Sequence, residues 1–268
     1  MLAPSPVVKK TAKTALSGHW LQASAVSCVL IFAFFIGELS ASLISIVAGK
    51  VGFIIFFIAF LIFALSPLAL GVLYWFRRLL WGQNDETVTI FRYFSSLSEY
   101  KRALHFILIL TCKLGGAAVI LLLPSFIVWM LSSERFYVWF DIPFPVWTSS
   151  LGTLNSFLII IAVFALLFIA LKYYLAPFLF ISDDDIHPAE AVNMSTVISK
   201  RTGADFFGLV LSFIGWIILS LFIAPLIFTV PYFWASCAVH CRFAVTAYNR
   251  DVERFNNNNT PHYTVDEV

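Results

Sequence analysis

Two ionisable residues interrupt long apolar stretches of this sequence. Glu38 lies within IGELSASLISIV and Lys113 within ILILTCKLGGAAVILLL. An ionisable group in the core of a membrane costs roughly 2.5–3.5 kcal/mol on insertion scales, so it usually faces other protein segments and often has a function. Glu38 and Lys113 are therefore candidates for a buried ion pair, or for a substrate- or proton-linked site. The alternative is that Lys113 extends to the nearer polar surface while Glu38 is protonated or lies near the outer interface.

Three residues of metal-ligating type occur in the stretch SCAVHC. The i, i+3, i+4 spacing puts Cys237, His240 and Cys241 on one face of a helix. Zinc accepts such ligands, but a structural zinc site needs four, and the sequence has no second cluster that would supply the rest. We therefore expect no metal here and interpret the cysteines as small apolar residues beside a hydrogen-bonded histidine.

The sequence gives no sign of an enzyme or of a cofactor. Asp183, Asp184 and Asp185 could hold magnesium for phosphate chemistry, but no second acidic motif accompanies them, and carboxylates also suit a loop that opens a helix. The chain has no His-Glu-x-x-His pair, no Gly-Lys phosphate loop and no Gly-x-Ser-x-Gly elbow. We expect a protein without catalytic residues.

The composition indicates that these residues are positioned by membrane-spanning helices. Hydrophobic residues make up 60% of the 268 and charged residues 12%, and the mean hydropathy is +0.90. A soluble domain is nearer half apolar and a quarter charged, so this chain has too little polar surface to cover itself in water. The four cysteines lie in apolar runs, which argues against a disulfide framework.

Six apolar runs reach the roughly 20 residues that a transmembrane helix needs. They cover residues 22–47, 52–76, 104–131, 154–181, 206–224 and 226–248. The last two are separated only around Pro225, so they form either two spans or one broken segment, and five spans is the alternative count. The predicted fold is an all-α integral membrane helical bundle. It forms a single domain over residues 1–255, followed by a disordered cytoplasmic tail at 256–268.

The placement of Lys and Arg favours six spans with both termini in the cytoplasm. In this arrangement nearly all basic residues face one side of the membrane, and only Lys50 and Arg135 face the other. Cytoplasmic loops carry such an excess of positive charge. The first apolar run follows three lysines but is far longer than the core of a signal peptide, so we interpret it as a retained span.

Three segments on the basic side are predicted to form short amphipathic helices in the membrane interface. They begin near Val8, Ile90 and Pro188, and the last is expected to turn at Thr202-Gly203 before the next span. Basic residues in or beside two of these segments are candidates for contact with lipid or with a partner: Arg92, Lys101, Arg102, Lys200 and Arg201.

Several segments together resemble a bacterial family of multi-pass membrane proteins known only as domain of unknown function 975. The segments that carry the resemblance are LSGHW (16–20), TIFRYFSSLSEYKRAL (89–104), AEAVNMS (189–195) and LSFIGW (211–216), followed by Pro231-Tyr232. The sequence departs from the family pattern at SKRTGAD (199–205) and at His240-Cys241. The resemblance implies a helical integral protein of the bacterial plasma membrane, and it brings no agreed activity and no catalytic residue.

We expect a non-enzymatic scaffold or accessory protein that acts through its basic cytoplasmic face. Its expected partners are the lipid bilayer, anionic lipid headgroups and other proteins or further copies of itself, but not nucleic acid. Basic surface residues attract anionic headgroups by about 1 kcal/mol each. The alternative is a transporter or permeation pathway for a small substrate that uses Glu38 and Lys113.

Overall fold

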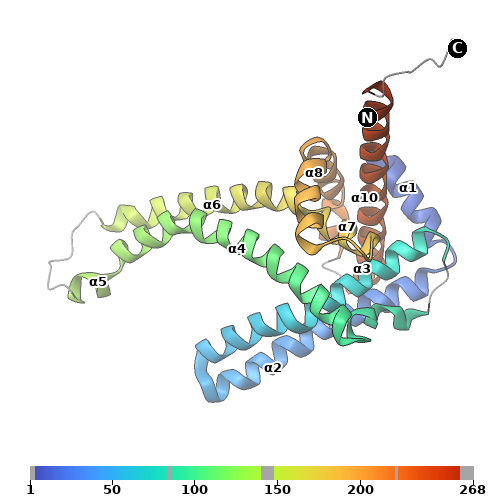
Figure 1. Ribbon diagram of the computed structural model, residues 1–268. Helices are drawn as coiled ribbons and strands as arrows, with labels where there is room; N and C mark the ends of the chain where they lie inside the picture. The colour runs from blue at the N-terminus through green and yellow to red at the C-terminus, as the bar shows by residue number, and fades with distance from the viewer. Residues whose placement is uncertain (1–3, 84–85, 140–147, 221–222, 260–268) are drawn as a thin grey trace, which may run out of the picture.

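The computed structural model describes residues 4–83, 86–139, 148–220 and 223–259. This part of the chain consists of helices joined by short turns and contains no strand, which confirms the all-α prediction (Figure 1). The elements in chain order are α1 (Ser5–Leu16), α2 (Trp20–Phe60), the π-helix η1 (Leu61–Leu65), α3 (Ser66–Leu80), the 3-10 helix η2 (Thr87–Phe94), α4 (Leu97–Ser132), α5 (Glu134–Trp139), α6 (Thr148–Tyr173), α7 (Ala176–Ser182), α8 (Pro188–Leu211), α9 (Ile214–Leu219) and α10 (Ile223–Asn259).

Helix α2 folds back on itself at Gly49. Its backbone there has φ 66° and ψ −168°, a conformation that residues with a Cβ rarely adopt. The second limb continues through η1 into α3, so the apolar runs predicted at 22–47 and 52–76 form the two limbs of one hairpin. We call α2 with η1 the first arm, α4 with α6 the second arm, and α9 with the N-terminal half of α10 the third arm.

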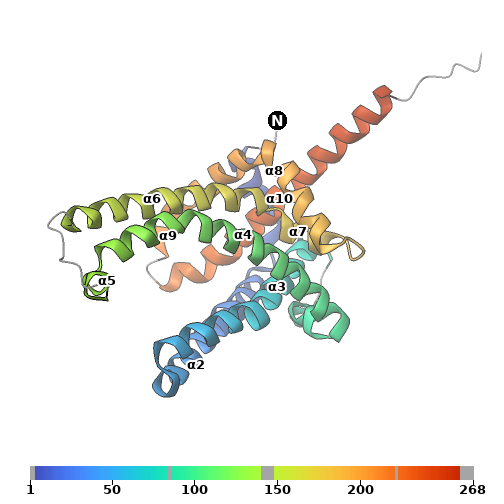
Figure 2. The same cartoon turned by 60° about the vertical axis from the view of Figure 1, so that its left-hand side comes forward.

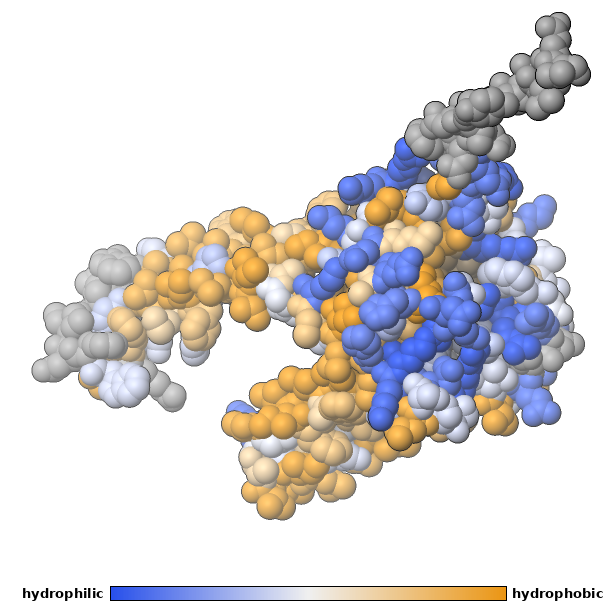
Figure 3. Space-filling model, viewed as in Figure 1, coloured by the Kyte–Doolittle hydropathy of each residue, from blue (hydrophilic) through white to orange (hydrophobic). Residues whose placement is uncertain are grey.

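The arms carry most of the exposed apolar surface of the molecule. Ile46 and Val47 near the tip of the first arm are 78% and 92% exposed, and α4 and α6 expose a comparable set of side chains. Among the residues that the structure describes, three helical segments are long and apolar enough to cross a membrane: Trp20–Leu80, Leu97–Ser132 and Ser150–Ser182. Figure 3 shows the apolar arms leaving a polar region, and Figures 1 and 2 show the first two arms diverging. The bundle expected from the sequence is therefore open between these arms.

The polar region, which we call the hub, consists of α1, α3, η2, the first two turns of α4 that precede the second arm, α7, α8 and the C-terminal half of α10. Its core is well packed, and Trp75 and Phe76 of α3 are almost fully buried. The apolar face of α1, with Val8, Ala12 and Leu16, is also fully buried in the cluster that includes α3 and α10 residues. The predicted N-terminal amphipathic helix thus exists, but its apolar face binds the hub and is not free to lie on lipid.

Two prolines, one at the start of α3 and one inside α10, leave backbone carbonyls that accept hydrogen bonds from side chains of other helices. Pro67 has no N–H to donate to the carbonyl of Phe63 four residues earlier, and the hydroxyl of Tyr100 donates to that oxygen at 2.8 Å. A buried polar group in a membrane protein needs such a partner. The same arrangement occurs at Pro231.

In α10, Pro231 leaves the carbonyl of Ile227 free, and Ser24 Oγ of α2 donates to it at 3.1 Å. The prolines therefore join helices instead of only bending them. Tyr100 links α4 to the end of the first arm, and Ser24 links the base of the first arm to the third.

The region after Pro188 differs from the sequence prediction. Pro188 does begin a helix, but α8 continues to Leu211 without the expected turn at Thr202-Gly203. The Thr202 hydroxyl donates to the carbonyl of Ile198 one turn earlier at 3.1 Å, which is compatible with an unbroken helix. The chain then breaks at Ser212, and α9 and α10 pack together as separate helices. Residues 206–248 therefore include the end of α8, all of α9 and the first part of α10, which begins at Ile223, two residues before Pro225.

Two of the segments considered from the sequence, the C-terminal tail and the loop between α4 and α6, are described only in part. Helix α10 extends to Asn259, so it includes the four asparagines that the sequence assigned to a disordered tail. The remainder of that tail, 260–268, lies outside the described residues. In the loop between α4 and α6, α5 forms over Glu134–Trp139, and residues 140–147 are likewise not described.

A close backbone contact at Gly71 provides a test of this packing. A methyl group on Gly71 would overlap the carbonyl oxygen of Ile90, which belongs to the backbone of η2 and cannot move aside alone. We expect Gly71→Ala to lower the free energy of unfolding by about 3 kcal/mol through overpacking. Thermal unfolding in detergent, followed by circular dichroism, would measure this.

Gly116→Ala is the matched control, because no atom lies within 4 Å of the added methyl. The higher helix propensity of alanine should leave that variant unchanged or up to about 1 kcal/mol more stable. Equal losses in the two variants would mean that η2 does not pack on α3 as described.

Candidate functional site

Basic side chains of the hub bind the C-terminal ends of helices that are distant in sequence. Arg77 Nη1 donates to the carbonyl of Ile181 at 2.7 Å and Nη2 donates to that of Ser182 at 3.0 Å, at the end of α7. The last carbonyls of a helix have no partner within it and carry partial negative charge, so a cation there is favourable. The same arrangement recurs at two further helix ends.

Lys9 Nζ donates at 2.8 Å to the carbonyl of Ser212, which follows α8, and it also lies 4.2 Å from the ring centre of Phe213. Burial lowers the pKa of Lys9 from its ordinary value. Arg242 Nη1 donates to the carbonyl of Leu80, the last residue of α3, at 3.3 Å. These long-range contacts join α1 to the end of α8 and α10 to the end of α3.

Asp184 gathers two of the basic residues that the sequence presented as lipid- or partner-facing candidates. Its carboxylate lies 2.8 Å from Arg92 Nη2 and 3.7 Å from Arg102 Nη1. Arg102 also donates to the carbonyl of Asp183 at 2.7 Å. The aspartates after α7 thus serve as internal acceptors for arginines, which is a use other than the magnesium site considered from the sequence.

Aromatic rings complete the surroundings of these arginines. The guanidinium of Arg92 lies 4.3 Å from the ring centre of Tyr74, and that of Arg102 lies 4.6 Å from Phe180. Burial acts to lower the pKa of Arg92, but the hydrogen bond to Asp184 and the nearby charges outweigh it, so the pKa is raised. Both arginines are fixed, charged members of the hub.

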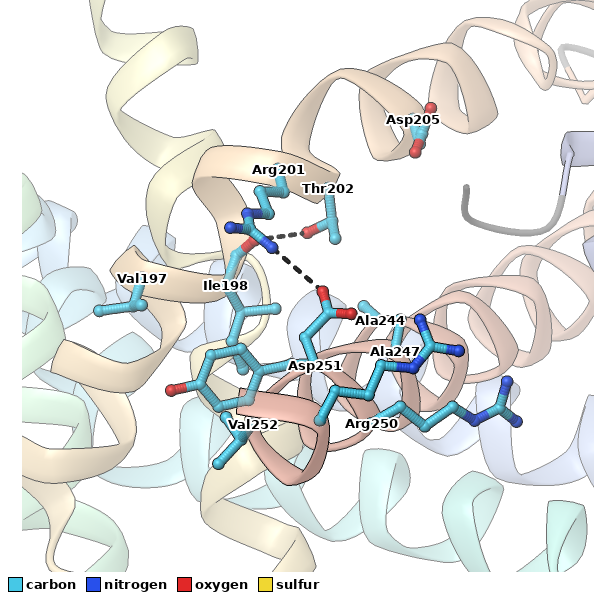
Figure 4. A pocket seen from close by; sticks show the side chains of 12 residues that line it. Val197, Ile198, Arg201, Thr202, Asp205, Ala244, Ala247, Arg250, Asp251 and Val252 are labelled. Carbon is cyan, nitrogen blue, oxygen red and sulfur yellow. Dashed lines mark hydrogen bonds and ion pairs between the residues drawn. The ribbon is translucent and has the colours of Figure 1, made fainter. Parts of the chain in front are cut away.

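Of the five basic candidates, Lys101 and Lys200 are exposed, whereas Arg201 forms an ion pair with Asp251 at 3.0 Å. That pair crosses a groove between α8 and α10 with a volume of about 860 Å³ (Figure 4). Besides the pair, the polar groups that line the groove are Thr202, Asp205, Tyr248, Arg250 and Arg254. Apolar side chains such as Val197 and Ala244 form most of the remaining wall.

The groove offers both signs of charge on an apolar base. Figure 4 shows Arg201 reaching from α8 toward Asp251, while Asp205 lies further along α8 and away from the pair. The arginines exceed the aspartates by one in this set. The arrangement suits recognition of a polar, predominantly anionic group, and it presents no nucleophile held by a base.

The structure does not bring Glu38 and Lys113 together. Both side chains are exposed, on the first and second arm respectively, and no ion pair found among the described residues includes either of them. Lys113 Nζ instead donates to Oδ1 of Asn193 in α8 at 2.9 Å. Lysine therefore extends toward the hub, which is the alternative considered from the sequence, and Glu38 stands alone on the apolar arm.

Cys237, His240 and Cys241 do share one buried helical face, but they belong to a hydrogen-bonded core. His240 Nε2 lies 3.1 Å from the hydroxyl of Tyr174, which in turn lies 2.7 Å from Thr202 Oγ1. Within the described ranges, no group of three or more His, Cys, Asp or Glu residues is placed to hold a metal ion.

The direction of each hydrogen bond in the series His240, Tyr174 and Thr202 follows from the last acceptor, which is a backbone carbonyl. The hydroxyl proton of Thr202 goes to the carbonyl of Ile198, so Thr202 accepts from Tyr174. Tyr174 then accepts from His240, which places a proton on Nε2 of that histidine. A histidine beside two buried cysteines could be found in the sequence, but Tyr174 could not, because 66 residues separate it from His240.

Comparison with known proteins identifies the family. Residues 1–244 match the family described as "Protein of unknown function (DUF975)". The chain belongs to this family. No curated protein matches the chain, and no solved structure matches it. The match confirms the family resemblance predicted from the sequence, and it extends from α1 through most of α10.

The role of Asp184 in this DUF975 protein can be tested by substitution. Asp184→Asn removes the charge that Arg92 and Arg102 share, and we expect it to lower the free energy of unfolding by about 1 kcal/mol, since the carboxylate is partly exposed to solvent. The loss should shrink as salt is added. Chemical unfolding in detergent at low and high ionic strength would measure both effects.

Asp185→Asn is the matched control, because no ion pair found in the described part of the chain includes Asp185. Its stability should stay within about 0.5 kcal/mol of that of the parent. A loss as large as that of Asp184→Asn would indicate a general charge effect of the loop.

Proposed function

We propose that this DUF975 protein is a non-enzymatic, six-span protein of the bacterial plasma membrane that acts as a scaffold or accessory protein. The apolar arms cross the bilayer, and the hub lies on the cytoplasmic face with both termini. The observation that carries the proposal is the separation of the chain into apolar arms and one polar hub (Figure 3). The arms meet lipid, and the hub meets lipid headgroups and other proteins.

The arrangement of the hairpins supports an even number of crossings. Each arm leaves the hub and returns to it, and α1 and the C-terminal half of α10 both belong to the hub (Figures 1 and 2). Three outward and three return segments account for six crossings. The basic residues of the hub then lie on the side where loops are normally positive.

The transport alternative requires Glu38 and Lys113 to share a pathway. Their separation on diverging arms, together with the contact between Lys113 and Asn193, favours the scaffold role. Lys101 and Lys200, two of the exposed lysines of the hub, are available to attract anionic headgroups. Arg92 and Arg102 contribute indirectly by holding the hub together.

The topology makes a direct labelling prediction. In a variant with the exposed or half-buried Cys28 and Cys112 replaced by alanine, a cysteine at Lys200 should react with an impermeant maleimide only from the cytoplasmic side. A cysteine at Lys50, beside the turn of the first arm, should react only from the outside. Intact spheroplasts and inverted vesicles distinguish the two sides, and labelling of both positions from the same side would refute the six-span arrangement.

The headgroup interaction can be measured by native mass spectrometry of the protein in detergent. Replacing both Lys101 and Lys200 by glutamine should reduce retention of anionic lipid roughly tenfold or more, since each lysine contributes about 1 kcal/mol. Lys50→Gln is the control, because this exposed lysine lies at the opposite end of the molecule. Its retention should match that of the parent.

The same experiment tests the alternative function. Glu38→Gln and Lys113→Gln should leave lipid retention unchanged if the arms only cross the bilayer. A bound small molecule that the parent retains, and that both of these variants lose, would favour transport over the scaffold role.

A further inference from the structure

Two arginines of the hub, Arg77 and Arg242, have no acidic partner among the residues that the structure describes. Arg92 and Arg102 share Asp184, and Arg201 is paired with Asp251. Arg77 and Arg242 take part in none of the ion pairs found among the described residues, and each instead donates to backbone carbonyls at the end of a helix. Asp184 is near enough to act on Arg77 electrostatically, but its carboxylate is bound by the other two arginines.

The two unpaired arginines lie against the same aromatic ring. The guanidinium carbon of Arg77 is 5.2 Å from the ring centre of Trp81, and that of Arg242 is 4.7 Å from it. The two guanidinium carbons therefore lie within about 10 Å of each other, a distance at which like charges still repel. The fold keeps two cations close together without a carboxylate between them.

A cavity of about 320 Å³ opens between these arginines, at the junction of α3, α7 and α10. Trp81, Ser182 and Thr246 line it together with Arg77 and Arg242, and apolar side chains form the rest of its wall. None of the lining residues is acidic. This distinguishes the cavity from the groove between α8 and α10, which contains two aspartates.

The hydrogen bonds that the lining residues already make determine which of their N–H and O–H groups remain available to a ligand. The hydroxyls of Ser182 and Thr246 donate to the carbonyls of Phe178 and Arg242 within their own helices. Arg77 uses both terminal nitrogens, and its buried Nε–H has no acceptor in the described part of the chain. Arg242 donates through Nη1 alone and is exposed, so its remaining N–H groups are available.

We propose that this cavity binds the phosphate group of a phosphate ester between Arg77 and Arg242. An anion there would offset the repulsion of the two guanidiniums and accept hydrogen bonds from Arg242 in the forked geometry that suits phosphate oxygens. The volume is at the lower end of the roughly 300–1,000 Å³ typical of ligand sites, so it accommodates a phosphate with a small substituent. Trp81 covers one side and is 45% exposed, leaving room for that substituent.

The phosphate can belong either to a soluble ester or to a lipid headgroup at the membrane surface. The arginines would bind the phosphate group in the same way in both cases, so an experiment must distinguish a soluble ester from a lipid. The site does not rest on the scaffold role, since its binding of a phosphate group can be measured on the purified protein whatever the protein does in a membrane.

The first measurement is calorimetric titration of the full-length protein, in an uncharged detergent, with inorganic phosphate against chloride at equal ionic strength. Arg242→Gln should weaken phosphate binding about tenfold or more, which corresponds to the loss of one charge-assisted hydrogen-bonded contact. Lys50→Gln is the matched control, because it also removes one positive charge from an exposed side chain, but at the turn of the first arm and outside the cavity. Its dissociation constant should stay within about twofold of the parent's.

Two further variants keep the test decisive if Arg242→Gln does not fold. Arg242→Lys retains the charge but loses the fork, so it should bind phosphate more weakly than the parent and more tightly than any variant without the charge. Trp81→Phe should keep binding while abolishing the change in tryptophan fluorescence that phosphate produces in the parent.

Nanodiscs distinguish the two sources of phosphate. Selective retention of phosphatidylglycerol over phosphatidylcholine that is lost in Arg242→Gln, without binding of free phosphate, assigns the site to a lipid headgroup. Binding of inorganic phosphate assigns it to a soluble ester. Absence of both kinds of binding in the parent, or equal losses in Arg242→Gln and Lys50→Gln, would overturn the site. Lipid retention that depends on Lys101 and Lys200 but not on Arg242 would leave the proposed function intact and remove only this site.

Discussion

The contact between Arg77 and the end of α7 holds the first two arms of this protein in one structure. Arg77 lies at the end of α3, which returns from the first arm, and α7 follows the returning helix of the second arm. The carbonyls of Ile181 and Ser182 need donors because their helix ends there, and no nearby residue in sequence supplies them. Without this contact, a charged guanidinium and two backbone acceptors would be left unpaired at the junction of the two arms.

Other basic residues of the hub bind carbonyls at the ends of different helices in the same way. Lys9 binds the carbonyl that follows α8, and Arg242 binds the last carbonyl of α3. A long flexible side chain can reach a helix end across a junction that backbone atoms cannot close. The same basic residues from which a cytoplasmic orientation is predicted therefore also bind the ends of the helices.

The sequence predicted the helices of the arms well because apolar length is a local property. The runs at 22–47 and 104–131 lie inside α2 and α4, and the boundary near Gly49 follows from the polar interruption by Gly49-Lys50. The hub could not be predicted in the same way. Its contacts join residues such as Arg77 and Ile181, 104 positions apart, and no periodicity in the sequence encodes that distance.

The candidate site residues likewise could be predicted from local sequence, whereas their long-range partners could not. A charge inside an apolar run was readable, so Glu38 and Lys113 were found, but their partners were not, because Asn193 lies 80 residues from Lys113. The continuous α8 was also missed. Thr202-Gly203 has the composition of a turn, whereas in the structure the hydroxyl of Thr202 donates to the carbonyl one turn earlier, both residues are buried, and α8 continues to Leu211.

The divergence of the arms follows from the solvent in which they are proposed to lie. In water, the apolar side chains of α2 and α4 would gain free energy by packing together, but lipid chains are as apolar as leucine and supply no such force. Helices in lipid associate where polar or small residues meet, as Ser125 and Asn155 do between α4 and α6, with 2.6 Å between their oxygen atoms. No such contact joins the first arm to the second among the hydrogen bonds of the described residues, apart from that of Tyr100 at their base. The polar contacts of the hub, and not the apolar surface of the arms, therefore decide how the helices are arranged.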